Sequence, residues 1–216
     1  MEDFSSIRRE YHAPALHEQD LGNDPITAVS NWLREAIESQ LIHEPTAMTL
    51  ATVDEHNQPS ARVVLMKTID ADGFVFCTNY ESRKASDIDH NPRVTLMLYL
   101  DRMYRQIRIE GRVARVSAAE SDAYFAARPR GAQIGAWASH QSAVIADRSV
   151  MQQKEAAITA RFEGQNVPRP DFWGGYRVTP ALIEFWQGQP NRLHDRICFS
   201  RVNAQTNQWQ VQRLSP

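Results

Sequence analysis

The segment Arg192-Leu-His-Asp-Arg196 places basic or titratable side chains at every second position near the end of the chain. In an extended chain, alternate side chains point to the same face, so Arg192, His194 and Arg196 would share one side. Three such groups repel one another unless an anion lies between them. Trp186, a few residues earlier, has a ring that can stack on a planar ligand. The pattern predicts a segment that binds an anion and a ring, with an exposed basic edge strand as the alternative.

Other groups have the composition of a phosphate site. Ser82-Arg83-Lys84 opens an expected helix, where backbone N–H groups, a hydroxyl and two cations can hold an anion. Tyr124 and Arg128 lie four residues apart, on one face of a second expected helix. Arg62 and Lys67 lie five residues apart on an expected strand, which would point them to opposite faces. For each group, an ordinary capped helix start or a solvated surface charge is the alternative.

The elements that must position these groups follow from hydrophobic spacing and from turn residues. Apolar residues at helical spacing predict a helix from Pro25 to Gln40, with Asp24 as its N-cap. Capping patterns and prolines predict further helices at 82–90, 118–127 and 142–162, and a Pro/Gly-rich loop at 168–175. Alternation and turn signals predict strands at 46–53, 60–69, 74–78, 93–100, 103–116, 176–178, 183–186, 196–202 and 209–213.

Strands at both ends of the chain, with helices between them, predict a mainly β (α+β) fold, a β-barrel with peripheral helices. A doubly wound sheet is not expected, because βαβ alternation and a GxGxxG turn are both missing. We expect one domain over residues 23–216. Residues 1–22 would form an N-terminal arm that becomes ordered only against something else.

Composition excludes several classes of protein. The chain has 216 residues, of which 42% are hydrophobic and 23% charged, as in soluble globular proteins. A formal net charge of −2 argues against electrostatic binding of nucleic acid. The longest apolar run is too short to span a membrane and the N-terminus lacks a signal peptide's apolar core, so a cytoplasmic protein is expected. Cys77 and Cys198 suggest neither a disulfide framework nor a metal site.

No Walker loop or serine nucleophile elbow is present, which leaves hydrolases and NTP-driven enzymes without support. Of the 24 basic residues only three are lysine. Such an excess of arginine suits bidentate phosphate recognition, and a compositional bias of the genome explains it equally well. The residues alone therefore indicate several phosphate-type sites and a planar, phosphorylated cofactor.

Motifs along the whole chain resemble those of the pyridoxamine 5′-phosphate oxidase family, FMN enzymes of vitamin B6 metabolism. The motifs are Arg8-Arg-Glu-Tyr11, Pro45-Thr-Ala-Met48, Ala51-Thr-Val-Asp-Glu55, Thr78-Asn79, Ser82-Arg-Lys84, Asn91-Pro-Arg-Val94, Arg128-Pro-Arg130, Gln133-Ile-Gly-Ala-Trp137, Phe172-Trp-Gly-Gly175, Ile183-Glu-Phe-Trp-Gln-Gly188, Arg192-Leu-His-Asp-Arg196 and Arg213-Leu-Ser-Pro216. The resemblance implies an FMN-binding split β-barrel and a homodimer, with FMN at the subunit interface.

The resemblance also implies the site residues. The residues implied for FMN are Arg62, Val63, Val64, Leu65, Met66, Lys67, Cys77, Thr78, Arg83, Lys84, Gln106, Gln141, Ser142, Trp186 and Arg196. Those implied for the substrate are Arg8, Tyr11, Lys67, Tyr124, Arg128, Ala132, Arg192, Leu193 and His194, with Arg192 and His194 as the catalytic pair. No metal is implied.

The implied reaction oxidises pyridoxamine or pyridoxine 5′-phosphate to pyridoxal 5′-phosphate. Hydride passes to flavin N5, and O2 then reoxidises the flavin and becomes H2O2. Two alternatives stay open: an oxidase of the same fold acting on another planar substrate, as in phenazine pathways, and a non-catalytic FMN- or pyridoxal-phosphate-binding protein. The base that removes a proton is not identified by the sequence.

Two positions depart from the family pattern. Ala132 stands where the family usually has a serine that helps to bind the substrate phosphate. The loss of one hydrogen bond to a charged group corresponds to roughly ten- to a hundredfold in affinity. Cys77 stands where an aromatic residue is common, and a backbone contact there would survive the change.

Overall fold

The computed structural model describes residues 2–7, 9–203 and 207–216. Its strands are β1 (Ala47–Val53), β2 (Pro59–Asp70), β3 (Gly73–Asn79), β4 (Arg93–Leu100), β5 (Arg105–Arg115), β6 (Trp173–Gln187), β7 (Asp195–Arg201) and β8 (Trp209–Arg213). Its helices are α1 (Glu18–Leu21), α2 (Pro25–Ser39), α3 (Arg83–His90), α4 (Ala118–Ala126), α5 (Arg130–Ala138) and α6 (Arg148–Arg161), with short 3-10 turns η1 (Asp101–Met103) and η2 (Pro190–Arg192).

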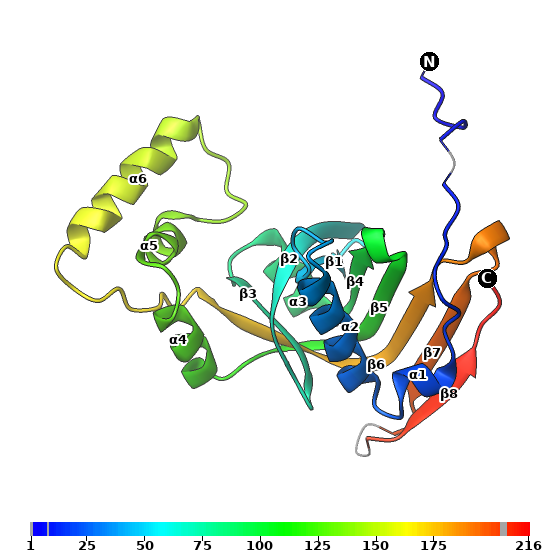
Figure 1. Cartoon of the computed structure of the whole chain (residues 1–216). Coiled ribbons are helices and arrows are strands. Elements are labelled where there is room, and N and C mark those ends of the chain that lie inside the picture. The colour runs from blue at the N-terminus through cyan, green and yellow to red at the C-terminus, as the bar shows by residue number, and fades with distance from the viewer. Residues whose placement is uncertain (1, 8, 204–206) are drawn as a thin grey trace.

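The strands form one antiparallel sheet that closes on itself. Neighbours follow the order β3-β2-β1-β4-β5-β6-β7-β8, and β3 also pairs with β6, so six strands make a barrel (Figure 1). Strands β7 and β8 extend the sheet beyond β6. Alternate side chains such as Leu96 and Leu98 of β4 and Ile107 and Ile109 of β5 are fully buried inside the barrel. The predicted barrel with peripheral helices is confirmed.

Strand β6 differs from the prediction of a loop and two short strands. It runs without a break for 15 residues and pairs with β5, β3 and β7. Pro180 lacks an N–H, and it lies opposite Gly111 at a shift of the β5–β6 register. A Cβ on Gly111 would lie 2.3 Å from the carbonyl oxygen of Thr179, so glycine is required for this close approach. This register shift is a β-bulge, and it allows β6 to continue from its pairing with β3 to its pairing with β7.

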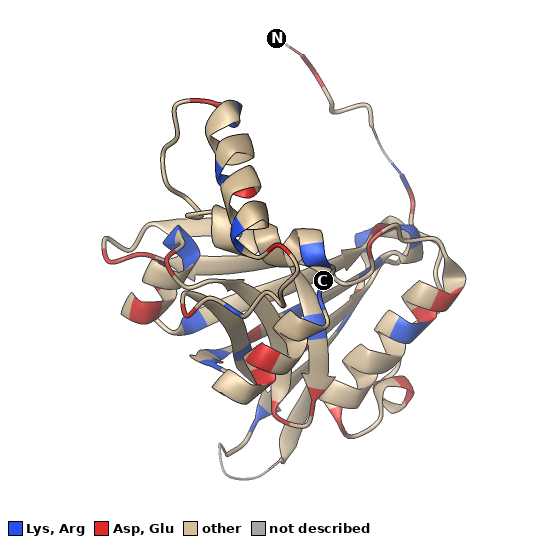
Figure 2. Ribbon diagram, turned by 90° about the vertical axis from the view of Figure 1, so that its left-hand side faces the viewer, with Lys and Arg blue, Asp and Glu red and all other residues tan. Residues whose placement is uncertain are grey.

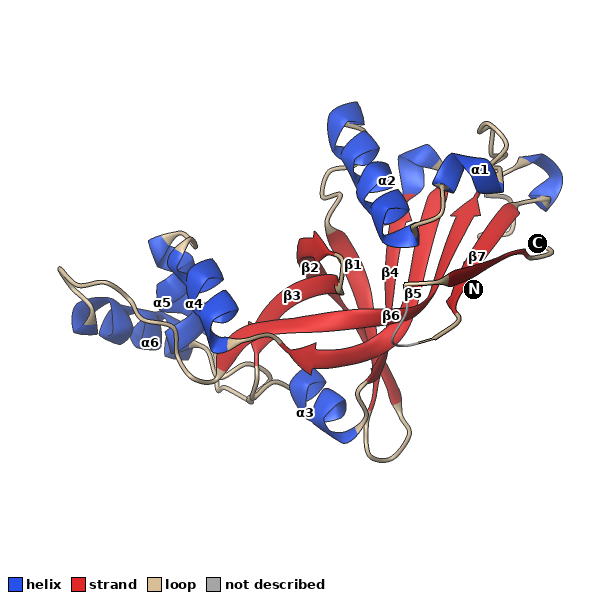
Figure 3. Ribbon diagram, turned by 90° about the horizontal axis from the view of Figure 1, so that it is seen from below, coloured by secondary structure: helices blue, strands red, loops and turns tan. Residues whose placement is uncertain are grey.

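The helices cover the barrel and build a second core beside it. In α2 the Asp24 carboxylate accepts hydrogen bonds from the backbone of Ile26 and Thr27, and Trp32 packs on Phe185 with ring centroids 5.1 Å apart. Helices α4, α5 and α6 gather at one side of the barrel (Figure 3). The apolar residues of this second core come from these helices, from the loop after α6 and from the start of β6: Phe125, Ile134, Phe162, Val167 and Trp173.

The predictions for α2, α3 and α4 are confirmed within two residues, whereas α5 was not predicted and α6 begins later than expected. The N-cap of α6 is Asp147, whose carboxylate accepts a hydrogen bond from the backbone of Ser149. Residues 142–147 therefore form a loop, and this loop leaves Gln141 and Ser142 free of a helix.

Part of the N-terminal segment is ordered against its own chain, contrary to the expectation for the arm. Leu16 and Leu21 are buried. The Arg213 guanidinium donates to the Glu18 carboxylate and to the backbone oxygen of Leu16, and the backbone N–H of Leu16 donates to Asp195. These contacts hold the segment on β7 and β8.

Acidic and basic residues are interspersed over the molecule (Figure 2). Among the described residues, no helix is long and apolar enough to cross a bilayer.

Candidate active site

A cavity of about 620 Å³ opens between β2, β3 and the α4–α5 side of the molecule, and we call it the β2–β3 cavity. Many residues that the sequence singled out line it. They are Val63, Val64, Leu65, Lys67, Cys77, Thr78, Lys84, Tyr124, Arg128, Ala132 and Gln141. Side chains from β2, β3, α3, α4 and α5 and from two connecting segments thus meet around one space.

A β-bulge in β2 determines which residues face the cavity. Met66 pairs with Phe76 and Thr68 with Val75, so Lys67 is the extra residue. Bulges of this kind re-aim a side chain, and the Lys67 side chain lines the cavity. Met66, by contrast, is buried in the barrel core.

Lys84 forms one positively charged corner of the cavity. Its ammonium donates to Gln141 Oε1 at 2.6 Å and to the hydroxyls of Thr78 and Ser82 at 3.1 Å. Burial, together with the charge of Arg62, lowers the pKa of Lys84 to about 8. An anion bound here would oppose both effects, because it would favour the charged ammonium.

The loop before α6 meets the start of α3 at the same corner. The Ser142 hydroxyl accepts a hydrogen bond from the backbone N–H of Arg83 at 3.2 Å. Ser142 has a positive φ of 74°. The predicted cradle relied on the Ser82 hydroxyl, but Ser82 is buried and its hydroxyl donates to the backbone oxygen of Asn79. Lys84 instead meets residues of the loop before α6, a segment distant in sequence.

The side chains of two predicted cofactor residues, Arg62 and Arg83, lie outside the β2–β3 cavity. The Arg62 guanidinium donates to Thr52 and Ser60 and lies 3.5 Å from the Asp87 carboxylate. Arg83 lies 3.7 Å from Asp54 and is exposed. Neither side chain lines the β2–β3 cavity.

A second positively charged corner is built around Trp173 at the start of β6. The Arg128 guanidinium lies 4.4 Å from the Trp173 ring centroid, and the Tyr124 ring stacks on Trp173 at 6.1 Å. Arg128 Nη1 is buried without a hydrogen-bond partner among the described residues. Burial lowers the pKa of Arg128. A buried donor without an acceptor is costly, so this corner has the chemistry to bind an anion.

Cys77 also lines the cavity, and it carries a free thiol. Burial raises the pKa of Cys77 to about 11, against the opposing effect of Arg128 and Lys67. The thiolate is therefore disfavoured at neutral pH, and the side chain contributes surface to the cavity.

Aromatic and basic residues gather at the other end of β6, in what we call the Tyr11 cluster: Tyr11, Tyr104, Trp186, Arg192 and His194. The Tyr11 ring lies 5.1 to 5.7 Å from the rings of Tyr104, His194 and Trp186. Trp186 and His194 are 4.6 Å apart, and Arg192 lies 5.8 Å from the Tyr11 ring. The N-terminal segment thus covers the Arg192–His194 turn.

The conformation of this turn differs from the extended chain that was predicted. Residues 190–192 form the 3-10 turn η2, and Asn191 and Arg192 have positive φ values of 56° and 65°. Extended structure begins only at Asp195. Arg192 and His194 therefore meet at Tyr11 through a turn, while Arg196 lies apart on β7.

Hydrogen bonding determines the form of the His194 imidazole. The backbone N–H of Gln189 donates to Nδ1 at 3.1 Å, so the neutral ring carries its proton on Nε2. Burial and the neighbouring Arg192 charge lower the pKa of His194. The ring is therefore neutral at neutral pH and presents an Nε2–H donor.

The remaining predicted residues lie near this end. Trp186 pairs with Arg196 on one side and with Gln106 on the other. The Arg196 guanidinium pairs with Glu184. Leu193 is exposed, and Arg8 lies outside the described residues.

The two groups of residues are far apart within one chain. Trp173 and Trp186 are thirteen residues apart on β6, which corresponds to roughly 43 Å along a strand. Figure 1 shows the α4–α5 side and the η2 side at opposite ends of β6. A single flavin-sized ligand cannot contact both ends in one protomer.

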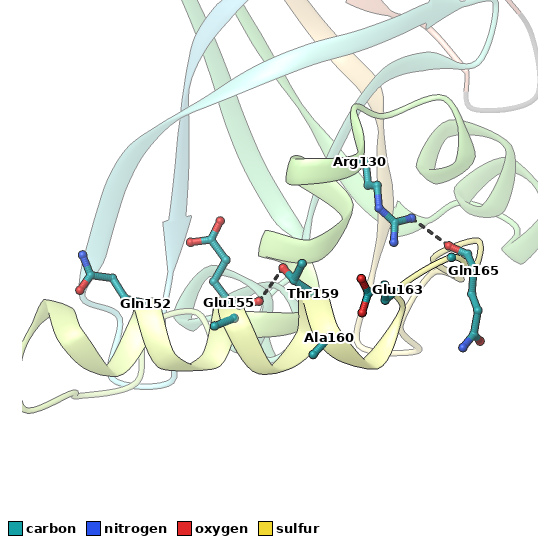
Figure 4. A pocket seen from close by; sticks show the side chains of 9 residues that line it. Arg130, Gln152, Glu155, Thr159, Ala160, Glu163 and Gln165 are labelled. Atoms are coloured by element: carbon teal, nitrogen blue, oxygen red, sulfur yellow. Dashed lines mark hydrogen bonds between the residues drawn. The ribbon is translucent and has the colours of Figure 1, made fainter.

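A cavity of about 790 Å³ lies between α5 and α6 (Figure 4). Arg130 lines it, but its guanidinium already donates to the backbone oxygens of Gln165 and Phe162. Thr159 likewise donates to the backbone of Glu155. This larger cavity contains none of the predicted site residues.

Comparison with known proteins decides the family. The sequence profile "Pyridoxamine 5'-phosphate oxidase" matches residues 33–162, and "Pyridoxine 5'-phosphate oxidase C-terminal dimerisation region" matches residues 173–216. The chain belongs to the pyridoxamine 5′-phosphate oxidase family. It is therefore a member of an oxidoreductase family with a split barrel, and its C-terminal region supports a homodimer.

Relatives agree with this assignment. Proteins of Burkholderia thailandensis and Burkholderia mallei named "Pyridoxine/pyridoxamine 5'-phosphate oxidase" are each 50% identical over the full length of both chains. The crystal structure of PhzG from Burkholderia lata, in complex with tetrahydrophenazine-1-carboxylic acid, has a TM-score of 0.86 at 30% identity and covers 94% of this chain and 99% of its own. An FMN-binding protein from Nostoc punctiforme shares the fold, with a TM-score of 0.68 at 17% identity, over 86% of this chain and 96% of its own.

Sequence reasoning missed residues that support the predicted ones. Trp173 was assigned to a loop, yet it holds both Tyr124 and Arg128. Glu184 was quoted only as part of a motif, although it is the buried partner of Arg196. The signal that could have identified Glu184 is its position as a lone acidic residue on the same predicted strand as Trp186.

Proposed function

We propose that the protein is an FMN-dependent oxidase that converts pyridoxamine or pyridoxine 5′-phosphate to pyridoxal 5′-phosphate. The observation that carries this proposal is the pair of separate cationic corners in the β2–β3 cavity. Lys84 forms one corner, and Lys67 with Arg128 forms the other. A phosphorylated cofactor and a phosphorylated substrate, bound side by side, require two such corners.

The Lys84 corner fits the FMN phosphate. It supplies an ammonium, the hydroxyls of Thr78 and Ser142, and the Gln141 amide. Residues 63–65 of β2 would line the flavin ring, since they form the adjoining wall. Bound FMN would accept a hydride from the substrate and return the electrons to O2, giving H2O2.

The Arg128 corner fits the substrate phosphate. The unpartnered Nη1 of Arg128 and the Lys67 ammonium are available as donors, and Tyr124 adds a phenol. Anchoring the phosphate remote from the reacting carbon would fix the position of that carbon, which is how binding energy contributes to rate.

The Tyr11 cluster completes the site from the partner subunit in this proposal. Because the cluster lies at the far end of β6, it can reach a ligand in the β2–β3 cavity only across a subunit interface. Trp186 and Arg196 of one protomer would then meet FMN held by the other. The C-terminal dimerisation region that begins at residue 173 supports this arrangement.

The geometry of His194 gives it the role of a hydrogen-bond donor. With Nδ1 occupied by the Gln189 N–H, the neutral ring offers Nε2–H to an oxygen on the substrate ring. Arg192 would lie beside it through the shared contact with Tyr11. We assign the two residues to the orientation of the substrate ring.

A second candidate is an oxidase acting on another planar substrate, of the phenazine type. Two observations favour it: Ala132 lines the cavity without a hydroxyl to bind phosphate, and PhzG superimposes on nearly the whole chain. A non-catalytic protein that holds FMN or pyridoxal phosphate is the third.

An anaerobic spectrum of the FMN-loaded protein distinguishes the three. Mixing with pyridoxine 5′-phosphate should bleach the oxidised flavin, and air should restore it with the appearance of pyridoxal 5′-phosphate and H2O2. A flavin that stays oxidised with this substrate, but is reduced by a dihydrophenazine, would support the second candidate. A flavin that neither substrate reduces would support the third.

A further inference from the structure

Glu184 is the buried acidic group on the outer face of the barrel, at the β5–β6–β7 junction. It is 3% exposed, and on β6 it pairs with Arg108 of β5 and with Cys198 of β7. Burial raises the pKa of the Glu184 carboxyl, but hydrogen bonds from Arg196 and Arg108 outweigh this effect and hold that pKa below its usual range. Glu184 is thus a permanent anion at neutral pH.

The Glu184 carboxylate accepts hydrogen bonds from Arg196 with both of its oxygens. Arg196 Nε donates to Oε1 at 2.9 Å, and Arg196 Nη2 lies 3.2 Å from Oε2. Arg108 Nη2 donates to Oε2 from the other side at 2.5 Å. The fork geometry fixes the plane of the Arg196 guanidinium as well as its position.

Arg196 makes a third hydrogen bond, to the backbone, and two of its N–H donors remain unused within the described chain. Its Nη1 donates to the backbone oxygen of Ser215 at 2.9 Å. A guanidinium has five N–H donors, so three are used within the described chain and two remain. Arg196 lies directly opposite Trp186 in the β6–β7 register, so the two side chains share one face of the sheet.

Stability alone gives little reason for this arrangement. The desolvation of a buried ion pair offsets most of its attraction, and apolar residues of similar volume often stabilise a protein as well or better. The arrangement instead delivers one oriented, charged donor group at a defined place on the surface.

We propose that Glu184 is a positioning residue, which holds the Arg196 guanidinium beside Trp186 in the orientation that binds the flavin cofactor. This inference rests on the proposed function. It differs from a structural role because Glu184 acts on the cofactor only through Arg196.

A double-mutant cycle on FMN affinity tests the inference. Apoprotein of the wild type and of Glu184→Gln, Arg196→Ala and the double variant is titrated with FMN, with flavin fluorescence as the signal. We expect Glu184→Gln to raise the Kd about ten- to a hundredfold, because a charged hydrogen-bonding partner is lost. In the Arg196→Ala background the same change should have no further effect on the Kd.

The matched control is Glu110→Gln. Glu110 also pairs with Arg108 on this face but does not contact Arg196, so FMN affinity should stay within about twofold of wild type. Glu184→Asp, which keeps the charge, should restore part of the affinity. Light scattering of each variant reports whether the dimer persists, and thermal melting reports whether the chain is folded.

The outcomes separate this inference from the proposed function. Failure of the wild type to bind FMN would overturn the proposed function, and this inference with it. A wild type that binds FMN, together with equal affinity in Glu184→Gln, would overturn only the role of Glu184. Losses that multiply in the double variant, or a Glu184→Gln chain that is monomeric or unfolded while Glu184→Asp binds no better, would show a structural role instead.

Discussion

The basic side chains at the two ends of β6 differ in how their charges are balanced. In the β2–β3 cavity, burial lowers the pKa of Lys84 to about 8 and also lowers that of Arg128, and within the described part of the chain neither side chain is hydrogen-bonded to a carboxylate. At the other end, the hydrogen bonds that Arg196 donates to the Glu184 carboxylate raise the pKa of Arg196. At the first end the cations have no carboxylate partner and can bind the anion of a ligand. At the second end Glu184 already supplies the anion that pairs with Arg196.

The difference indicates which cations bind the phosphate of a ligand and which cations orient the ligand. A cation that lacks a partner in the free protein gains most from a ligand's phosphate, whereas a cation that is already paired contributes direction and shape. The variants that follow test this distinction, in decreasing order of expected effect.

Arg128→Ala should have the largest effect. Removal of the unpartnered guanidinium takes a charged donor from the substrate corner, so we expect KM for pyridoxine 5′-phosphate to rise roughly ten- to a hundredfold. The Kd for FMN should change by less than about twofold, because Lys84 and its partners are untouched. Steady-state kinetics and a fluorescence titration measure the two quantities.

The control for Arg128→Ala is Arg148→Ala, an exposed arginine at the start of α6. Its KM should equal that of the wild type. Equal loss of FMN and substrate affinity in Arg128→Ala would mean that the cavity does not have two separate corners.

The lowered pKa of Lys84 predicts a pH dependence of cofactor binding. The ammonium is charged below about pH 8 in the free protein and loses its proton above that pH. Bound phosphate favours the charged form, so the Kd for FMN should be flat at lower pH and rise by up to tenfold per pH unit above about pH 8.

Lys84→Arg should abolish this dependence, since a guanidinium stays charged throughout the range. Riboflavin, which has no phosphate, is the matched ligand, and its affinity should show little of the effect. A dependence of equal size for riboflavin would contradict the assignment of Lys84 to the phosphate.

Ala132→Ser should have a smaller effect of opposite sign. The new hydroxyl would add one donor to the cavity, so KM for pyridoxine 5′-phosphate should fall several-fold, up to about tenfold. Ala132→Val, which adds volume without a donor, is the control. An unchanged KM in Ala132→Ser, with kcat also unchanged, would favour a substrate that has no phosphate.

Glu18→Gln should have the smallest effect. Its ion pair with Arg213 ties the N-terminal segment to β8, but both side chains are substantially exposed. Exposed pairs contribute less than about 1 kcal/mol, so the free energy of unfolding in urea should fall by no more than that. A larger loss would show that this surface pair, unlike others of its kind, is essential to the fold.

The sequence predicted most strands because local alternation reports burial on one face. It did not predict that β6 is continuous, because the pairing of that strand with β3, β5 and β7 comes from distant segments. Pro180 and the preceding glycines are local signals for the end of a strand. The strand continues past Pro180 because Gly111, on the neighbouring strand, has no Cβ to clash with the backbone there.

The same limit applied to the site. The Ser82–Lys84 group and the Tyr124/Arg128 spacing are local patterns, and the structure brings Lys84, Tyr124 and Arg128 to one cavity, whereas Ser82 and Arg83 do not line it. The loop that brings Ser142 to α3 could not be predicted from helical periodicity, although Asp147 as an N-cap was a readable signal. The pairing of Arg196 with Glu184 depends on strand register, which no short motif encodes.

The unbroken run of β6 has a consequence for genetics. Because one strand carries the two groups of site residues at opposite ends, each site of the proposed dimer would draw one group from each chain. Co-expression of an Arg128→Ala chain with an Arg196→Ala chain would then produce mixed dimers with one intact site and one doubly defective site. With random pairing, such a population would recover roughly a quarter of the wild-type activity from two chains that are each impaired.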